Sequence, residues 1–411
     1  MNQPSPDPKR AERLPANVRW LGVASLFNDI ASEMIFPLMP QFLIVVLGGN
    51  KLYLGLIEGI ADTISSFLKL WIGAKSDQAG YRKAFVLWGY GIAALARPLS
   101  GFATLPWHLL SARAIDRIGK GIRTAPRDAL IADSTEKENR GRAYGFHRAM
   151  DHLGAAIGPF LATAFLLLFP NAIRELFWLS VIPGLLSVAV LWKGLHDVPR
   201  SESSQAVKLS LKPLGTPFRF FLVAFFFFTF GLISDAFLLL RAGELGIHAA
   251  WIPVVWCSFS LVKSSGNFLF GKLVDRTGPL PLLLAGWLLC VVVYFFFAIA
   301  SEAWEAVILF LLYGLVYAMT EPAERTLVAN LVGVEKKGLA FGWFNFIAGI
   351  AALPSSVLFG WLYQQHGSTI AFGTSAGIVS LSTVLLLLIY ALYRSFLKHD
   401  TTHRRDRTDN N

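Results

Sequence analysis

The sequence predicts an all-α membrane protein with twelve transmembrane helices, arranged as two pseudo-repeated six-helix bundles. Composition is the first observation: 54% of the 411 residues are hydrophobic and only 16% are charged, against about 25% charged residues in soluble domains. The second is a series of apolar runs of about 18 residues or more, which are continuous and lack the alternation of barrel strands. The third is an internal repeat that relates the two halves of the chain.

Each predicted span is an apolar run bounded by polar residues, and one long polar connection, from His196 to Gly215, follows the sixth span. This connection predicts an N-terminal six-helix bundle at 1–195, a linker at 196–217 and a C-terminal six-helix bundle with a short tail at 218–411. The predicted spans are residues 17–47, 52–75, 83–104, 107–131, 139–168, 172–193, 218–243, 249–270, 280–300, 303–329, 338–364 and 369–394.

Short stretches of the first half recur in the second half. GAKSDQAG from Gly73 pairs with GKLVDRTG from Gly271, and GRAYGFH from Gly141 pairs with GLAFGWF from Gly338. A parallel repeat of two bundles implies a central site between them, with access that alternates between the two sides of the membrane.

The formal charge of +10 reflects topology. Lys and Arg concentrate in both tails and in alternate connections, which predicts that both termini are cytoplasmic and that nucleic acid is not a partner. Cys257 and Cys290 both lie inside apolar runs, so we expect neither a disulfide nor a metal site, and no cofactor. The N-terminal segment is polar and proline-rich, and we expect no cleaved signal peptide.

Two copies of one loop pattern resemble the motif between the second and third helices of the major facilitator superfamily. The pattern comprises Gly73, Asp77, Gly80 and Arg82, with Gly271, Asp275 and Arg276 as its repeat. The resemblance extends over essentially the whole chain and implies the twelve-helix fold of that family, in which this loop is a gating latch. Gln78 and Tyr81 stand where basic residues are usual, so some cross-helix pairs of the latch are in doubt.

The predicted fifth span contains a spaced glycine pattern that ends in proline. Gly145, Gly154, Gly158 and Pro159 resemble the antiporter motif of the same family, although Ala162 and Thr163 replace its terminal glycine pair. Small residues also let helices approach closely without any transport role. Both interpretations, an antiporter motif and plain close packing, stay open.

Charged side chains recur inside four of the N-terminal spans, above all in RAIDRIGKGIRTAPRD from Arg113 to Asp128. Charges inside a membrane are costly and normally pair, face water or handle cargo. The cations are Lys69, Arg113, Arg117, Lys120, Arg123, Arg127 and Arg148, and the anions are Asp29, Glu33, Glu58, Asp62, Asp116, Asp128 and Asp151. Because the two sets match in number, a structural ion-pair network is the alternative to a binding site for most of them.

A subset near the middle of the membrane is expected to have a functional role. A proton-coupled carrier needs a carboxyl group whose proton occupancy responds to burial and to a nearby cation. The candidates for proton coupling are Asp29, Glu33, Asp62 and Arg113. The candidates for the substrate cavity are Asn28, Asp116, Arg117, Lys120, Arg148, Asp151, Asp235 and Lys263.

These features predict a secondary active transporter, not an enzyme. We expect a proton-coupled antiporter that exports a small polar or anionic solute, acts as a monomer among membrane lipids and resides as a multi-pass protein in a bacterial inner membrane. Three alternatives stay open: a proton symporter that imports an organic anion or metal chelate, a divalent-metal exporter, and a polytopic enzyme or sensor. The sequence contains no HExxH, nucleophile-elbow or phosphate-loop pattern, which disfavours the last of these.

Overall fold

The structure is a computed structural model that describes residues 14–79, 81–136, 139–198, 211–332 and 337–408. In these ranges the regular elements are helices, and each of the twelve predicted spans is helical. Seven stretches of the described chain are long and apolar enough to cross a membrane by length and composition. The last of these, Leu339–Ala391, covers most of the final two predicted spans. The all-α membrane class is therefore confirmed.

Contacts divide the chain into two compact units. Unit 1 contains Met1–Phe42, Phe67–Ala206 and Ala249–Cys257, and unit 2 contains Leu43–Ser66, Val207–His248 and Ser258–Asn411. Each unit holds most of one predicted half, but the first part of the second span belongs to unit 2 and the start of the eighth belongs to unit 1. The division at 196–217 stays a prediction, and residues 199–210 of that linker lie outside the described ranges.

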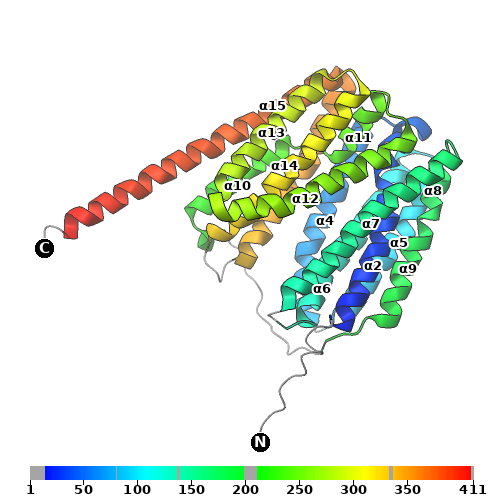
Figure 1. The fold of residues 1–411 in the computed structure, drawn as a ribbon, viewed down its shortest axis with the longest axis horizontal. Coiled ribbons are helices and arrows are strands. Elements are labelled where there is room, and N and C mark those ends of the chain that lie inside the picture. The colour runs from blue at the N-terminus through cyan, green and yellow to red at the C-terminus, as the bar shows by residue number, and fades with distance from the viewer. Residues whose placement is uncertain (1–13, 80, 137–138, 199–210, 333–336, 409–411) are drawn as a thin grey trace, which may run out of the picture. The chain divides into compact units, whose positions relative to one another are not determined.

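Unit 1 is built on helices that pack through small and aliphatic side chains. Its helices, labelled in Figure 1, are α2 (Ala16–Glu33), α5 (Lys83–Leu99), α6 (Pro106–Asp133), α7 (Arg140–Leu168), α8 (Ile173–Leu179) and α9 (Val181–Gly194), with the second part of α4 (Lys51–Ala79). α2 packs against α7 and α9, and α5 packs against α6 and α9. Val18, Leu21, Val86, Tyr90 and Leu191 are completely buried in the core between these helices.

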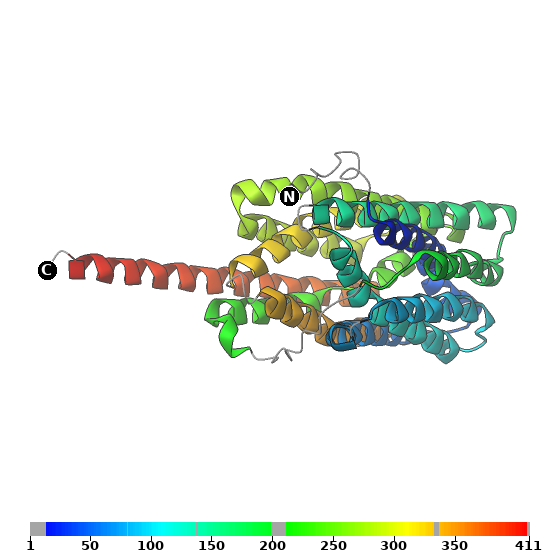
Figure 2. The same ribbon diagram turned by 90° about the horizontal axis from the view of Figure 1, so that it is seen from below.

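Unit 2 contains the remaining long helices. They are α10 (Thr216–Gly231), α11 (Asp235–Glu244), α13 (Pro279–Ile299), α14 (Ala303–Asn330) and α15 (Lys337–Thr408), with α12 (Ile252–Thr277) from Ser258 onward. α15 packs against α10 and α13, and α13 also packs against α14. Gly367 interrupts α15 with φ 80°, a backbone conformation that suits glycine and separates the two last predicted spans. The final part of α15 continues past the other helices of its unit in both ribbon views (Figures 1 and 2).

Proline and glycine explain several helix boundaries. α6, α10 and α13 each have a proline in the first turn, where its missing N–H and fixed φ are tolerated. The predicted span 17–47 is not one continuous helix: after α2 come η1 (Phe36–Leu38), α3 (Met39–Gln41) and the π-helical η2 (Phe42–Val46), with Pro37 and Pro40 in the first two. Likewise, 218–243 is divided into α10 and α11, and 172–193 into α8 and α9.

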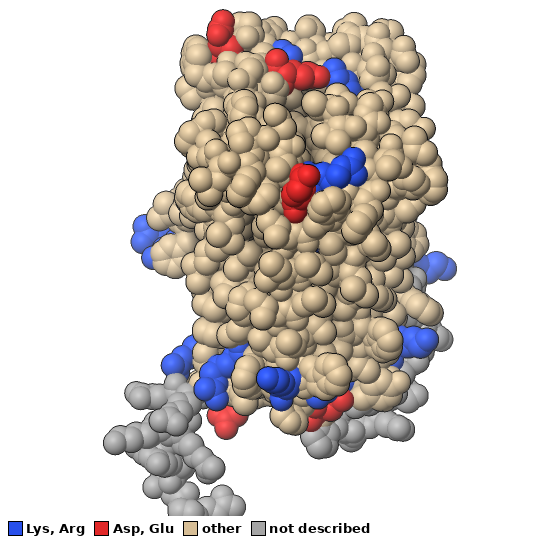
Figure 3. Space-filling view, turned by 90° about the vertical axis from the view of Figure 1, so that its right-hand side faces the viewer, with Lys and Arg blue, Asp and Glu red and all other residues tan. Residues whose placement is uncertain are grey.

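The surface agrees with a membrane environment. Figure 3 shows a face that is mostly free of charge, with most visible Lys, Arg, Asp and Glu side chains near its two ends. Large apolar side chains such as Trp88, Leu168 and Trp192 are more than two-thirds exposed, at 71%, 74% and 75%. Such exposure of apolar surface is expected where lipid is the solvent.

Candidate functional site

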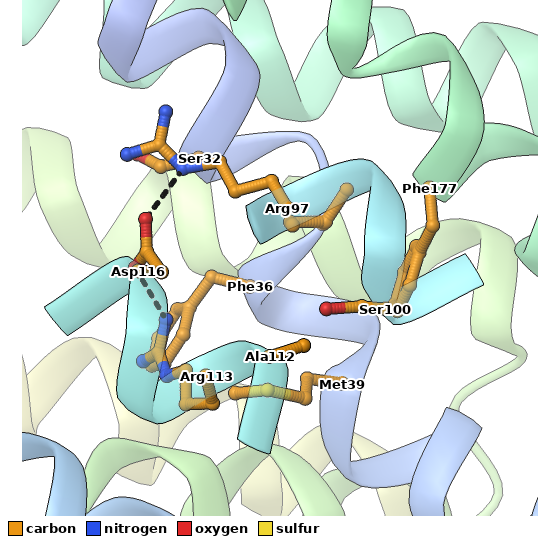
Figure 4. A pocket seen from close by; sticks show the side chains of 10 residues that line it. Ser32, Phe36, Met39, Arg97, Ser100, Ala112, Arg113, Asp116 and Phe177 are labelled. Carbon is orange, nitrogen blue, oxygen red and sulfur yellow. Dashed lines mark hydrogen bonds and ion pairs between the residues drawn. The ribbon is translucent and has the colours of Figure 1, made fainter. Parts of the chain in front are cut away.

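A buried arginine outside the set predicted from the sequence lies at the centre of the charged network in unit 1. Arg97 of α5 is 4% exposed, and its Nε donates to Oδ1 of Asp116 in α6 at 2.9 Å. Its Nη1 donates to both the backbone oxygen and Oδ1 of Asn28 in α2, each at 3.0 Å. One side chain therefore connects three helices of the unit, and Figure 4 shows its pairing with Asp116.

Two predicted arginines of α6 surround the same carboxylate. Arg113 Nη1 and Arg117 Nε each lie 3.8 Å from Oδ2 of Asp116. The guanidinium group of Arg113 also lies 4.9 Å from the centre of the Phe36 ring, a cation–π contact. Asp116 and both arginines thus belong to one ion-pair network, as the structural interpretation of this segment predicted.

A small cavity adjoins this network. Its volume is about 20 Å³, enough to hold a water molecule beside polar partners. Arg97, Arg113 and Asp116 line it together with the apolar side chains of Phe36 and Met39 (Figure 4). The predicted residues Arg113 and Asp116 therefore face a common space within unit 1.

Asp29 and Glu33 differ from Asp116 in the kind of partners they have. Asn28 Nδ2 donates to Asp29 Oδ1 at 2.8 Å. Ser32 Oγ donates to Glu33 Oε1 at 3.1 Å, and Trp256 Nε1 donates to Glu33 Oε2 at 2.6 Å. Among the described residues neither carboxylate makes a direct ion pair, although both are only partly accessible. Their partners are neutral donors.

More distant charges still act on these two carboxylates. Asp151 repels a charge on Asp29, while Arg123 and Arg97 attract it. Asp29 repels a charge on Glu33, and Lys120 of α6 attracts it. Lys120 is thus close enough to Glu33 to act on it electrostatically.

Asp151 of α7 has several partners of its own. The Ser25 hydroxyl donates to its Oδ1, and His147 Nδ1 and Arg148 Nη1 lie 3.5 and 3.6 Å from its Oδ2. The Arg148 side chain is 60% exposed, whereas that of His147 is 2% exposed. Arg148 is therefore placed at the surface of unit 1, and its predicted role in a cavity stays a prediction.

A second cluster of polar groups lies in unit 2. Tyr317 of α14 donates to Asp235 Oδ1 at 3.3 Å, and Lys263 Nζ of α12 pairs with Glu321 Oε1 at 2.7 Å. Lys263 also lies 4.1 Å from the centre of the Tyr317 ring. Asp62 of α4, a predicted proton-coupling residue, belongs to unit 2 and acts electrostatically on Asp235.

The break between α10 and α11 lies directly beside this cluster. Ser355 donates to the backbone oxygen of Leu232 at 2.8 Å. The N–H of Ile233 donates to Tyr294 Oη at 3.0 Å, and Tyr313 donates to the Ile233 oxygen at 3.3 Å. Backbone groups freed inside a membrane need such partners, and discontinuous helices of this kind mark binding sites in transporters.

The predicted gating residues form contacts at the ends of the helices in unit 1. Arg82 forms a salt bridge with Asp133 of α6, and its backbone N–H donates to Asp197 Oδ1 at 2.7 Å. Gly73 faces Ala125 of α6. Gly80 and the side chain of Asp77 lie outside the described part of the chain. In the repeat, Asp275 and Arg276 are exposed, and Gly271 has open space around it.

The glycines of the fifth span have unequal surroundings. A Cβ at Gly154 would lie 2.5 Å from the Leu26 oxygen, and one at Gly158 would lie 2.8 Å from the Ile30 oxygen. Gly145 has no such neighbour within 4 Å. Pro159 follows inside α7. Two of the three glycines thus allow α7 to contact the backbone of α2.

Arg97 and Trp256 are the site residues that sequence reasoning missed. Arg97 is the only charged residue between Lys83 and the end of the predicted third span, which is a signal that could have identified it. Trp256 gave no comparable signal, because an indole in an apolar run is ordinary in membrane helices. Its partner Glu33 lies far away in the sequence.

Comparison with known proteins gives a consistent result. The profile of the Major Facilitator Superfamily matches residues 21–255 and 220–408. An uncharacterized MFS-type transporter of Methanocaldococcus jannaschii is 30% identical over 383 residues, which cover 92% of this chain and 95% of that protein. The multidrug resistance protein MdtH of Photorhabdus laumondii is 23% identical, with 88% of this chain and 90% of that protein covered.

Solved structures agree on the fold. A bacterial homologue of the human lysosomal transporter Spinster, inward-facing and occupied, has a TM-score of 0.72 and 18% identity, and the match covers 96% of this chain and 99% of that one. The nucleoside transporter NupG has a TM-score of 0.72 and 12% identity, with 91% and 98% covered. The chain is therefore a multi-pass membrane transporter that belongs to the Major Facilitator Superfamily.

Proposed function

We propose that this transporter is a proton-coupled antiporter that exports a small polar or anionic solute by alternating access. Protons enter through the site that contains Asp29 and Glu33, while solute leaves. We further propose that it acts as a monomer in a bacterial inner membrane, with both termini in the cytoplasm. The basic tails and connections support that orientation.

The observation that carries the proposal is the contrast between the carboxylates of unit 1. Asp116 pairs with Arg97, Arg113 and Arg117, so protonation would break an established network. Asp29 and Glu33 accept hydrogen bonds only from neutral groups among the described residues. A carboxylate of this second kind can gain or lose a proton without leaving a buried cation unpaired, which is what coupling to a proton gradient requires.

The direction and the cargo rest on further features. The glycines of α7 that resemble an antiporter motif contact α2 on either side of Asp29. The relative MdtH is named for multidrug resistance, which supports export. Arg113 borders the small cavity and offers a guanidinium group to a polar or anionic solute. The described residues include no group of three or more His, Cys, Asp and Glu side chains that could hold a metal ion.

The experiment begins with the cargo. Purified protein is screened by thermal shift against organic anions, drugs and metal chelates at two pH values, because a ligand stabilises the state that it binds. The compound with the largest shift is then added to proteoliposomes that contain a pH-sensitive dye. Antiport and symport give proton fluxes of opposite sign when the solute moves down its gradient.

Variants then test the two carboxylates. We expect Asp29→Asn to abolish solute-driven proton flux and Glu33→Gln to reduce it, with folding retained in both. Glu175→Gln, which neutralises an exposed carboxylate of α8, is the matched control and should transport normally. Unchanged proton flux and an unchanged pH profile in Asp29→Asn would remove Asp29 from the coupling site. Flux of the symport sign in the wild-type protein would refute antiport.

A further inference from the structure

A cavity of unit 2 is lined by residues that do not belong to the charged clusters. It has a volume of about 430 Å³ and lies between the first turns of α10 and α13, the last turn of α14 and the distal part of α15. That volume falls within the roughly 300–1,000 Å³ of typical small-molecule pockets. Its walls are almost entirely apolar, with Phe221, Leu280, Leu331 and Leu386 among them.

The cavity has a buried interior and an exposed opening. Phe221 and Leu386 are 2% and 3% exposed, and Phe221 stacks on Phe344 of α15. Phe220 and Tyr390, in contrast, are 53% and 43% exposed, so the lining opens to the surface of the unit. In a membrane, an apolar chamber that opens to the lipid is suited to a hydrocarbon chain.

A cationic side chain lies close to this opening. Arg219 of α10 is exposed, and its Nη2 donates at 3.1 Å to Oγ1 of Thr216, which itself lines the cavity. Lys212, also exposed, lies in the short η5 turn (Lys212–Leu214) just before α10. Tyr390, which carries a hydroxyl group, is also a lining residue. The guanidinium group of Arg219 therefore lies beside a residue of the cavity wall.

We propose that this cavity binds an anionic phospholipid, with one acyl chain inside it and the phosphate group near Arg219. The chemistry of the two ends leads to this ligand. An acyl chain matches the apolar walls, and the headgroup phosphate matches the guanidinium group of Arg219 beside Thr216. Basic pockets between transmembrane helices bind phospholipid headgroups in this manner, and each Lys or Arg near an anionic surface strengthens binding several-fold.

The proposal is independent of the transported solute. Delipidated full-length protein is titrated with dioleoyl phosphatidylglycerol, dioleoyl phosphatidylcholine or glycerol phosphate, and bound lipid is counted by native mass spectrometry alongside a thermal-shift measurement. We expect the anionic lipid to bind in about one tight copy and to raise the unfolding midpoint most. Equal binding of both lipids would overturn the proposal, and so would equal protection by glycerol phosphate.

Two variants and two matched controls localise the site. Arg219→Gln should weaken binding of the anionic lipid about fivefold, whereas Arg19→Gln, at the same fourth position of α2 in the other half, should not. Leu280→Trp should displace the acyl chain by filling the cavity, whereas Leu288→Trp on the exposed side of α13 should not. If Leu280→Trp folds poorly, Leu280→Phe replaces it. Unchanged binding in both the Arg219 and the Leu280 variants would refute the assignment.

Discussion

Replacing Arg97 by leucine is the most direct test of the network in unit 1. The substitution removes the 2.9 Å ion pair with Asp116 and two 3.0 Å hydrogen bonds to Asn28. Because Coulomb energy varies inversely with distance, this pair is about 1.3 times stronger than either 3.8 Å pair of Asp116. Breaking a buried pair by removing one partner typically costs about 3–5 kcal/mol, and we expect a loss in that range.

A double-mutant cycle provides the assay. Arg97→Leu, Asp116→Leu and the double variant are compared by their apparent unfolding midpoints in one detergent, and these midpoints serve as a ranking because membrane proteins often unfold irreversibly. Asp116→Leu should be the least stable, since it leaves three guanidinium groups without their carboxylate. The double variant should recover part of that loss and unfold at a higher midpoint than Asp116→Leu. A double variant whose loss equals the sum of the single losses would refute the shared network.

Two further substitutions test the packing around the sites. Gly154→Val should lower stability by about 1–3 kcal/mol, because its Cβ would meet the Leu26 oxygen, whereas Gly145→Val has open space and should be tolerated in the same thermal assay. Tyr294→Phe leaves the buried N–H of Ile233 without its acceptor and should cost about 1–3 kcal/mol, whereas Tyr53→Phe, at a partly exposed position of α4, should change stability by less than about 0.5 kcal/mol. Unchanged stability of Tyr294→Phe would mean that water or another group accepts the hydrogen bond of the Ile233 N–H.

The helices could be predicted from the sequence because each apolar run is long enough to span a bilayer and is separated from the next by polar residues. The self-neutralising character of the charged segment could also be predicted, since unpaired charges are not retained in a membrane without a use. Arg113, Asp116 and Arg117 share one face of a helix by their spacing alone. The contacts of both arginines with Asp116 in α6 follow from this spacing.

The choice of partner between spans could not be predicted in the same way. Arg97 pairs with Asp116 because α5 and α6 present those side chains at one depth and one rotation, and neither quantity is encoded in local spacing. The helix break after Gly231 could not be predicted from local sequence either. It depends on Tyr294, Tyr313 and Ser355, which come from three different stretches of the chain and satisfy the freed backbone groups only after folding.

The two interpretations of the α7 glycines converge on the same contact. Close packing requires glycine at 154 and 158 because the Leu26 and Ile30 oxygens of α2 lie against those positions. Asp29 lies between these two residues of α2, and the Asp29 Cβ would itself be 3.0 Å from a Cβ at Gly154. The separation between α2 and α7 therefore sets how near Asp151 of α7 can come to Asp29, and hence how strongly the two carboxylates repel. A helix contact that looks purely structural can in this way adjust the charge of the proposed coupling group.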